Sequence, residues 1–167
     1  MNGSKVVERK SKDDTMNPAL KILQALNEAE RLYHRLVLLV GGVGSGKTTI
    51  LQGVSKQLDV KLINTNLELS KLLIEMTGRQ QTLQLPKLLE NLVNCDEKNI
   101  VLDNIEILFD VTLQQDPLRL LQTISRNRNI VVSWNGFVEN GKLIYAEPGH
   151  PEHRSYDAAS LSIINLN

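Results

Sequence analysis

The segment 41–48, with the sequence GGVGSGKT, constrains this chain more than any other part of it. It matches the pattern G-x-x-x-x-G-K-[ST] at every position, and it lies between an apolar run (residues 36–40) and a segment of helical periodicity (residues 47–58). Glycines allow such a loop to turn tightly and to direct its backbone N–H groups toward an anion at the start of a helix. The sequence therefore predicts a phosphate-binding loop between a buried strand and a helix.

The residue types of this loop indicate a nucleotide with magnesium. Lys47 supplies a cation for the β and γ phosphates, and the Thr48 hydroxyl is a ligand for Mg²⁺. The sequence contains no guanine-specific N-K-x-D motif, which disfavours a GTPase. We expect ATP and Mg²⁺ as cofactors, with the nucleotide bound by Gly41, Gly42, Val43, Gly44, Ser45, Gly46, Lys47, Thr48 and Thr49.

Apolar segments typical of strands alternate with segments of helical periodicity along the chain. This order predicts an α/β fold, a three-layer P-loop NTPase of the RecA/AAA-like branch whose mostly parallel sheet is flanked by helices, without a helical lid domain. We expect residues 1–15 to be a flexible tail and residues 16–167 a single domain. The expected strands are 36–40, 60–64, 99–103, 130–134, 142–146 and 161–165; the expected helices are 18–33, 47–58, 68–76 closed by Gly78, 86–94 opened by Pro86, and 116–125.

The strand at residues 99–103 is apolar and ends in a carboxylate, Asp103. The carboxyl ends of parallel strands face the ligand in open α/β sheets, so we expect Asp103 to hold Mg²⁺ together with Thr48, in part through water. The alternative is an aspartate that only ends a strand.

The residues after Asp103 leave the hydrolytic step open. Many P-loop ATPases place a glutamate directly after this aspartate, whereas this chain has Asn104, which can orient a water but cannot act as a base. Glu106 reaches the site if residues 104–109 begin a helical turn, and otherwise lies on the surface. Slow hydrolysis, or binding without turnover, is compatible with this pattern.

Further catalytic candidates lie around the strand at residues 130–134. Asn135 is the first candidate to contact the γ-phosphate and Ser133 the second, since strand alternation places both on one face; the alternative is an Asn-Gly turn. Arg126 and Arg128 precede the strand, and either could act as an arginine finger on a neighbouring subunit of a homo-oligomer. The alternative for both arginines is an exposed, solvated charge.

Composition limits the partners and the location. Lys plus Arg and Asp plus Glu number 19 each, so net charge gives no support to a stand-alone nucleic-acid binder, although DNA contact is compatible with a local basic patch. Cys95 is the single cysteine, so no intramolecular disulfide can form. The longest apolar run, residues 36–40, is far below the ~20 residues that span a bilayer. We expect a cytoplasmic protein without a membrane partner.

Four segments together resemble one family: 41–48, 100–106 (IVLDNIE), 125–136 (SRNRNIVVSWNG) and 145–152 (YAEPGHPE). From about residue 17 onward the chain is similar to the BrxF family, small P-loop proteins of type III BREX phage-defence systems. The resemblance implies a bacterial cytoplasmic protein with other BREX proteins as partners, and it implies no particular reaction.

Two functions remain open at this level. The first is a Mg²⁺-dependent ATPase that assembles into an oligomer and acts in a defence complex. The second is a nucleotide-gated adaptor that binds ATP with little turnover and recruits partner proteins.

Overall fold

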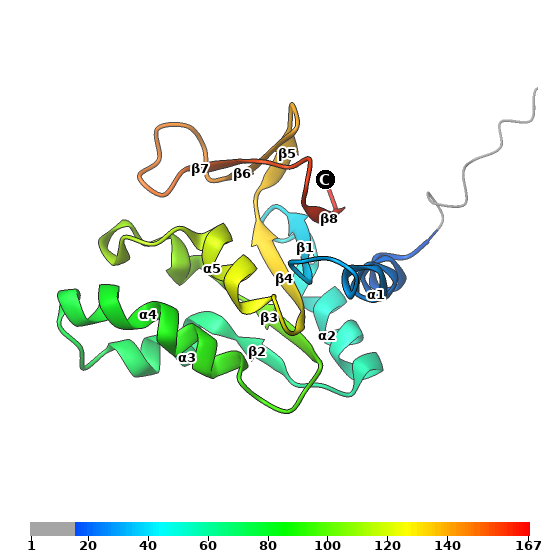
Figure 1. Ribbon diagram of the computed structural model, residues 1–167. Coiled ribbons are helices and arrows are strands. Elements are labelled where there is room, and N and C mark those ends of the chain that lie inside the picture. The colour runs from blue at the N-terminus through cyan, green and yellow to red at the C-terminus, as the bar shows by residue number, and fades with distance from the viewer. Residues whose placement is uncertain (1–15) are drawn as a thin grey trace, which may run out of the picture.

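The apolar runs of the sequence form a five-stranded parallel sheet in the computed structural model, which describes residues 16–167 (Figure 1). The strand order is β2-β3-β4-β1-β8, and each neighbouring pair is parallel. The strands are β1 (Leu36–Gly41), β2 (Leu62–Asn64), β3 (Asn99–Asp103), β4 (Asn129–Asn135) and β8 (Ser162–Asn165). The predicted α/β architecture with a mostly parallel sheet is confirmed.

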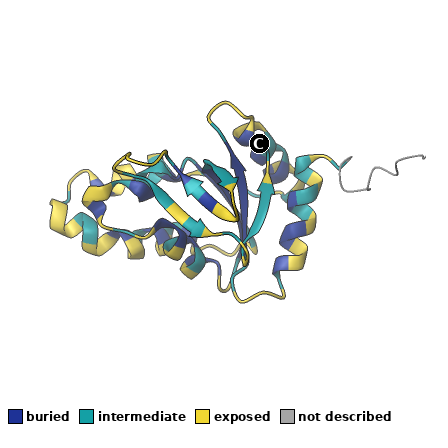
Figure 2. Cartoon of the chain, turned by 90° about the horizontal axis from the view of Figure 1, so that it is seen from above, coloured by how far each residue is buried: buried dark blue, intermediate teal, exposed yellow. Residues whose placement is uncertain are grey.

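Helices cover both faces of this sheet (Figure 1). One face carries α1 (Pro18–Ala29) and α2 (Lys47–Leu58), and the other carries α3 (Thr65–Leu73), α4 (Gly78–Val93) and α5 (Pro117–Ile124). Alternate residues of β1 enter the two cores, because successive side chains of a strand point to opposite faces. The central strands are consequently buried on both sides, whereas the outer surfaces of the helices are exposed (Figure 2). None of the helices within residues 16–167 is long and apolar enough to span a membrane.

A small antiparallel sheet follows β4, at the end of the parallel sheet where β4 finishes (Figure 1). It consists of β5 (Phe137–Glu139), β6 (Lys142–Tyr145) and β7 (Arg154–Asp157). Aromatic packing fixes this sheet: the Tyr145 ring stacks on Phe109 with centroids 3.5 Å apart, and the Trp134 Nε1–H donates to the Ile144 carbonyl over 3.2 Å. The sequence predicted β6 to within one residue, whereas β5 and β7 were not predicted.

Two predicted helix boundaries are wrong. The helix expected from residue 68 begins three residues earlier, at Thr65, where the Asn64 side chain accepts from the Leu67 N–H. Gly78 does not close that helix but opens α4, which is capped by Thr77 in a capping box with Gln80.

Pro86, expected at the first turn of a helix, lies inside α4. A proline cannot donate to the carbonyl four residues before it, which here belongs to Thr82. The Gln115 side chain donates to that carbonyl instead, over 2.9 Å, so a long-range contact replaces the missing helical hydrogen bond. Other boundaries differ by up to four residues, and the expected tail 1–15 lies outside the described residues.

Gly136 provides a test of the junction between the two sheets. A Cβ at this position would lie 1.9 Å from the Ile144 carbonyl oxygen, so Gly136→Ala forces β6 away from β4. We expect a loss of about 1 to 3 kcal/mol in the free energy of unfolding, measured by urea denaturation.

Gly53→Ala is the matched control, because a Cβ there meets nothing within 4 Å and lies inside α2. This variant should gain about 0.5 to 1 kcal/mol from helix propensity. Equal stability of the two variants would contradict the close approach at Gly136.

Candidate functional site

The loop between β1 and α2 carries the backbone geometry of an anion cradle. Gly44 and Gly46 have φ values of 77° and 90°, in the left-handed region that favours glycine. Gly46 is also the N-cap of α2, and no side chain of the described residues 16–167 caps this helix end. The first N–H groups of α2 therefore face the loop without a side-chain acceptor, the arrangement in which a helix N-terminus binds phosphate.

Lys47 is only 7% exposed, although it is a lysine at the first position of a helix. Its Nζ donates to the Gly41 and Gly42 carbonyls over 2.8 and 2.7 Å and to Ser45 Oγ over 3.3 Å. Burial lowers the pKa of Lys47, and the negative charges of Asp103 and Glu106 oppose this shift. The loop thus holds its ammonium group against its own backbone, close to two carboxylates.

Asp103 lies at the end of β3 and joins three elements. Its Oδ2 accepts from Thr48 Oγ1 of α2 over 2.7 Å, and its Oδ1 accepts from Ser133 Oγ of β4 over 2.5 Å. Asp103 is 4% exposed and has no Lys or Arg partner in an ion pair within residues 16–167. A buried carboxylate whose hydrogen bonds within residues 16–167 come from neutral donors fits a further cation partner.

The chemistry of these oxygens fits Mg²⁺. Thr48 and Asp103 offer a hydroxyl and a carboxylate oxygen side by side, and magnesium prefers oxygen ligands, a few from protein and the rest from phosphate and water. The described residues contain no cluster of three or more His, Cys, Asp or Glu that would form an all-protein metal cage.

Glu106 begins the 3-10 helix η2 (Glu106–Phe109), so the helical turn on which its position depended is present. Its two carboxylate oxygens accept from two amides: Oε1 from Asn135 Nδ2, and Oε2 from Asn66 Nδ2 over 2.8 Å. Glu106 is therefore brought to the same edge of the sheet as Lys47 and Asp103, and both of its oxygens have an amide donor.

Asn104 produces the turn that aims Glu106. Its φ is 52°, a left-handed conformation that asparagine adopts more readily than most residues. Its N–H donates to Asp103 Oδ1 over 3.0 Å, and its carbonyl accepts from the Asn66 N–H over 2.8 Å. In this geometry Asn104 shapes the backbone between the two carboxylates.

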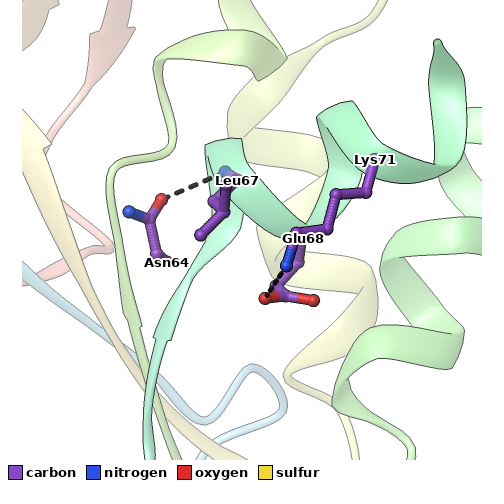
Figure 3. A network of polar contacts seen from close by, with 4 residues as sticks. All are labelled: Asn64, Leu67, Glu68 and Lys71. Carbon is purple, nitrogen blue, oxygen red and sulfur yellow. Dashed lines mark hydrogen bonds and ion pairs between the residues drawn. The ribbon is translucent and has the colours of Figure 1, made fainter.

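Asn66 is the site residue that sequence reasoning missed. Besides its bond to Glu106, its Oδ1 accepts from the Ile107 N–H over 2.8 Å, so it fastens α3 to the segment after β3. The neighbouring polar residues make only local contacts, since Asn64 caps α3 and Lys71 pairs with Glu68 on its exposed surface at 3.4 Å (Figure 3). The available signal was the position of Asn66 two residues after the end of β2, whose last residue Asn64 is in register with Asp103.

Most of the predicted residues line one cleft of about 340 Å³ at the carboxyl edge of the sheet. Gly41 and Gly42 contribute the carbonyls that hold Lys47, and Ser133 is buried beside Asp103. The cleft is lined by Val43, Gly44, Ser45, Gly46, Lys47, Thr48, Thr49, Asp103, Asn104, Glu106 and Asn135.

Arg126 and Arg128 lie elsewhere. They precede the first residue of β4, Asn129, whereas the cleft lies at its last residue. The Arg126 guanidinium lies over the Tyr33 ring, 5.4 Å from its centroid. Arg128 donates to Asn94 Oδ1 and to the Cys95 carbonyl, each over 2.8 Å, at the C-terminus of α4. Neither arginine reaches the cleft of its own chain.

Comparison with known proteins assigns the family. Residues 37–129 match the ATPase family associated with various cellular activities (AAA). The chain belongs to this family. The matched residues of this AAA protein include the phosphate loop, Asp103 and Glu106. Membership supports a P-loop ATPase activity.

Among solved structures, this AAA protein is similar to PCH-2 of C. elegans, with 21% identity and a TM-score of 0.42 over 89% of this chain and 40% of that one. It is also similar to AMPPCP-bound DnaA from Aquifex aeolicus, with 14% identity and a TM-score of 0.47 over 87% of this chain and 44% of that one. The chain spans less than half the length of either. No curated protein matches it.

The contacts of Asn66 predict a cost in stability. Asn66→Ala removes the acceptor of the Ile107 N–H and one donor to Glu106, so we expect a loss of about 1 to 3 kcal/mol in the free energy of unfolding. Urea denaturation measures this loss. Asn91→Ala is the control, because Asn91 is exposed on α4, and its expected change is within about 0.5 kcal/mol. A neutral Asn66→Ala would contradict the fastening of α3 to η2.

Proposed function

We propose that this AAA protein binds ATP with Mg²⁺ in the cleft described above and hydrolyses it slowly. The observation that carries the proposal is the 2.7 Å hydrogen bond between Thr48 and Asp103. It joins the end of the phosphate loop to the end of β3, so a hydroxyl and a carboxylate oxygen meet where the loop's N–H groups converge. A magnesium ion bound with the nucleotide would take its protein ligands from this hydroxyl and this carboxylate.

In this proposal the loop and Lys47 bind the phosphates. The uncapped N–H groups of α2 supply donors and the positive end of the helix dipole. The Lys47 ammonium exchanges the Gly41 and Gly42 carbonyls for phosphate oxygens, which carry more negative charge. Thr48 and Asp103 would hold Mg²⁺, which supplies charge neutralisation at the phosphates.

Glu106 is the proposed base and Asn135 the proposed γ-phosphate contact. Both residues line the cleft, and Asn135 donates a hydrogen bond to Glu106. This bond fixes the position of the proposed base relative to the end of β4. Asn104 remains a candidate to orient the attacking water. General-base catalysis of this kind contributes about 10²- to 10⁴-fold to a rate.

A second candidate function is a nucleotide-gated adaptor. The observation that favours it is the double amide contact of Glu106: Asn66 and Asn135 each donate to one carboxylate oxygen, so the group is held in place and each oxygen has one acceptor site less for a water. Such a protein would bind ATP, change its surface for a partner, and turn over little.

The cellular setting that we propose is a bacterial antiviral defence complex of the BREX type, in the cytoplasm. The support is the resemblance of residues 100–106, 125–136 and 145–152 to the BrxF family. We also propose a homo-oligomer, in which Arg126 or Arg128 acts on a neighbour's nucleotide, because neither arginine reaches its own cleft. Net charge gives no support for DNA contact, because it is zero. Such contact would require a local basic patch on the surface.

Lys47→Ala tests the binding site. Loss of a charge-assisted set of hydrogen bonds should weaken ATP binding by about 2 to 3 kcal/mol, or roughly 30- to 150-fold, as measured by calorimetry with Mg²⁺. Lys56→Ala, at an exposed position of the same helix, should retain the affinity of the unmodified protein. Unchanged ATP affinity in Lys47→Ala would contradict the proposal that the loop binds the phosphates.

Glu106→Gln distinguishes the two functions. The glutamine cannot accept a proton, so ATP hydrolysis should fall about 10²-fold or more while ATP affinity persists. Turnover is measured over a range of protein concentrations together with light-scattering mass. Unchanged turnover would exclude Glu106 as the base, and tight binding with negligible turnover at every concentration would favour the adaptor.

A further inference from the structure

Ser133 is a buried polar residue in a strand whose other central residues are apolar. It occupies the fifth of the seven positions of β4 and is 4% exposed. A buried hydroxyl needs a hydrogen-bond partner to offset its lost hydration. The partner of Ser133 is Asp103 Oδ1, on the neighbouring strand β3. The one polar side chain inside this stretch of β4 therefore donates to the proposed magnesium carboxylate.

The two oxygens of Asp103 are differently occupied. Oδ1 accepts from Ser133 Oγ and from the Asn104 N–H, at 2.5 and 3.0 Å. Among residues 16–167, Oδ2 accepts only from Thr48 Oγ1, at 2.7 Å, on the side of the phosphate loop. The donors of β4 and of the chain after β3 thus fix one oxygen, and the other is turned toward the loop.

This geometry separates Ser133 from Asn135, with which it shares a face of β4. Asn135 lines the cleft and donates to Glu106, whereas Ser133 does not line the cleft. A serine hydroxyl has a single proton to donate, and here Asp103 receives it. Ser133 therefore has no donor for a γ-phosphate, the role for which it was the second candidate.

We propose that Ser133 is a positioning residue that orients Asp103, so that Oδ2 alone is presented to Mg²⁺. The inference rests on the proposed function, since it concerns the same site. Groups that hydrogen-bond to a metal ligand fix its orientation, and their loss typically costs about 10- to 100-fold in metal affinity. Ser133 accordingly sets the magnesium requirement of nucleotide binding and leaves the phosphate contacts of the loop unchanged.

The test is the affinity for ATP measured by calorimetry at increasing Mg²⁺ and in the presence of EDTA. In Ser133→Ala we expect the Mg²⁺ concentration that gives half of the gain in ATP affinity to rise about 10-fold or more, with the affinity in EDTA unchanged. Ser125→Ala is the control: Ser125 is also buried and its hydroxyl donates to the Gln122 carbonyl at the end of α5, so its Mg²⁺ dependence should equal that of the unmodified protein.

A matched pair keeps the test decisive if Ser133→Ala does not fold. Ser133→Thr and Ser133→Val differ by a hydroxyl against a methyl group, and both suit a strand. The threonine variant should keep the half-effect Mg²⁺ concentration of the unmodified protein, and the valine variant should raise it about 10-fold or more. Equal Mg²⁺ dependence of the two would overturn the role of Ser133. Absence of ATP binding in the unmodified protein would instead overturn the proposed function itself.

Discussion

Parallel pairing of β1, β4 and β3 is the constraint on which the rest of the structure depends. Val40 is paired with Trp134, and Leu102 with Val132, so the three strands finish at one edge within a few residues of each other. Each strand then contributes a different chemical group at that edge. The phosphate loop follows β1, the carboxylate of Asp103 ends β3, and Asn135 ends β4. The register of buried apolar residues thereby fixes the positions of polar ones.

The continuous apolar runs that build the sheet also separate its polar groups from water. The residues of β4 on either side of Ser133, Val132 and Trp134, are fully buried in the core between the sheet and α3, α4 and α5. In this setting a hydroxyl and a carboxylate interact with less competition from water than they would on a surface. The strand that carries the fully buried indole of Trp134 is thus also the strand that holds both carboxylates of the cleft, through Ser133 and Asn135.

Much of this arrangement could be predicted from local sequence. The rest depends on contacts between residues that are far apart in the chain, which local patterns do not reveal. The bounds of α2 and β3 were predicted without error because a glycine-rich loop and a strand-ending aspartate are local signals. The bounds of α3 and α4 were predicted wrongly, because Gly78 and Pro86 were interpreted as helix ends. Pro86 is tolerated inside α4 because the distant Gln115 side chain donates to the carbonyl that the proline leaves without its helical donor. Asn66 was missed because its partners are 40 and 41 residues away in the chain. The position of Glu106 depends on a turn that the left-handed conformation of Asn104 creates. The sequence is compatible with this turn but does not determine it.

The junction between the two sheets has a mechanical consequence. Asn135 stands between Trp134 and Gly136, and both neighbours are held against one peptide group of β6: the Trp134 indole donates to the Ile144 carbonyl, and the Cα of Gly136 packs beside it. The strand is therefore clamped immediately before and immediately after the residue that reaches Glu106. A displacement of β6 relative to β4 would have to break the Trp134 hydrogen bond or the close contact at Gly136. The position of Asn135 at the polar end of β4 therefore depends on the position of β6.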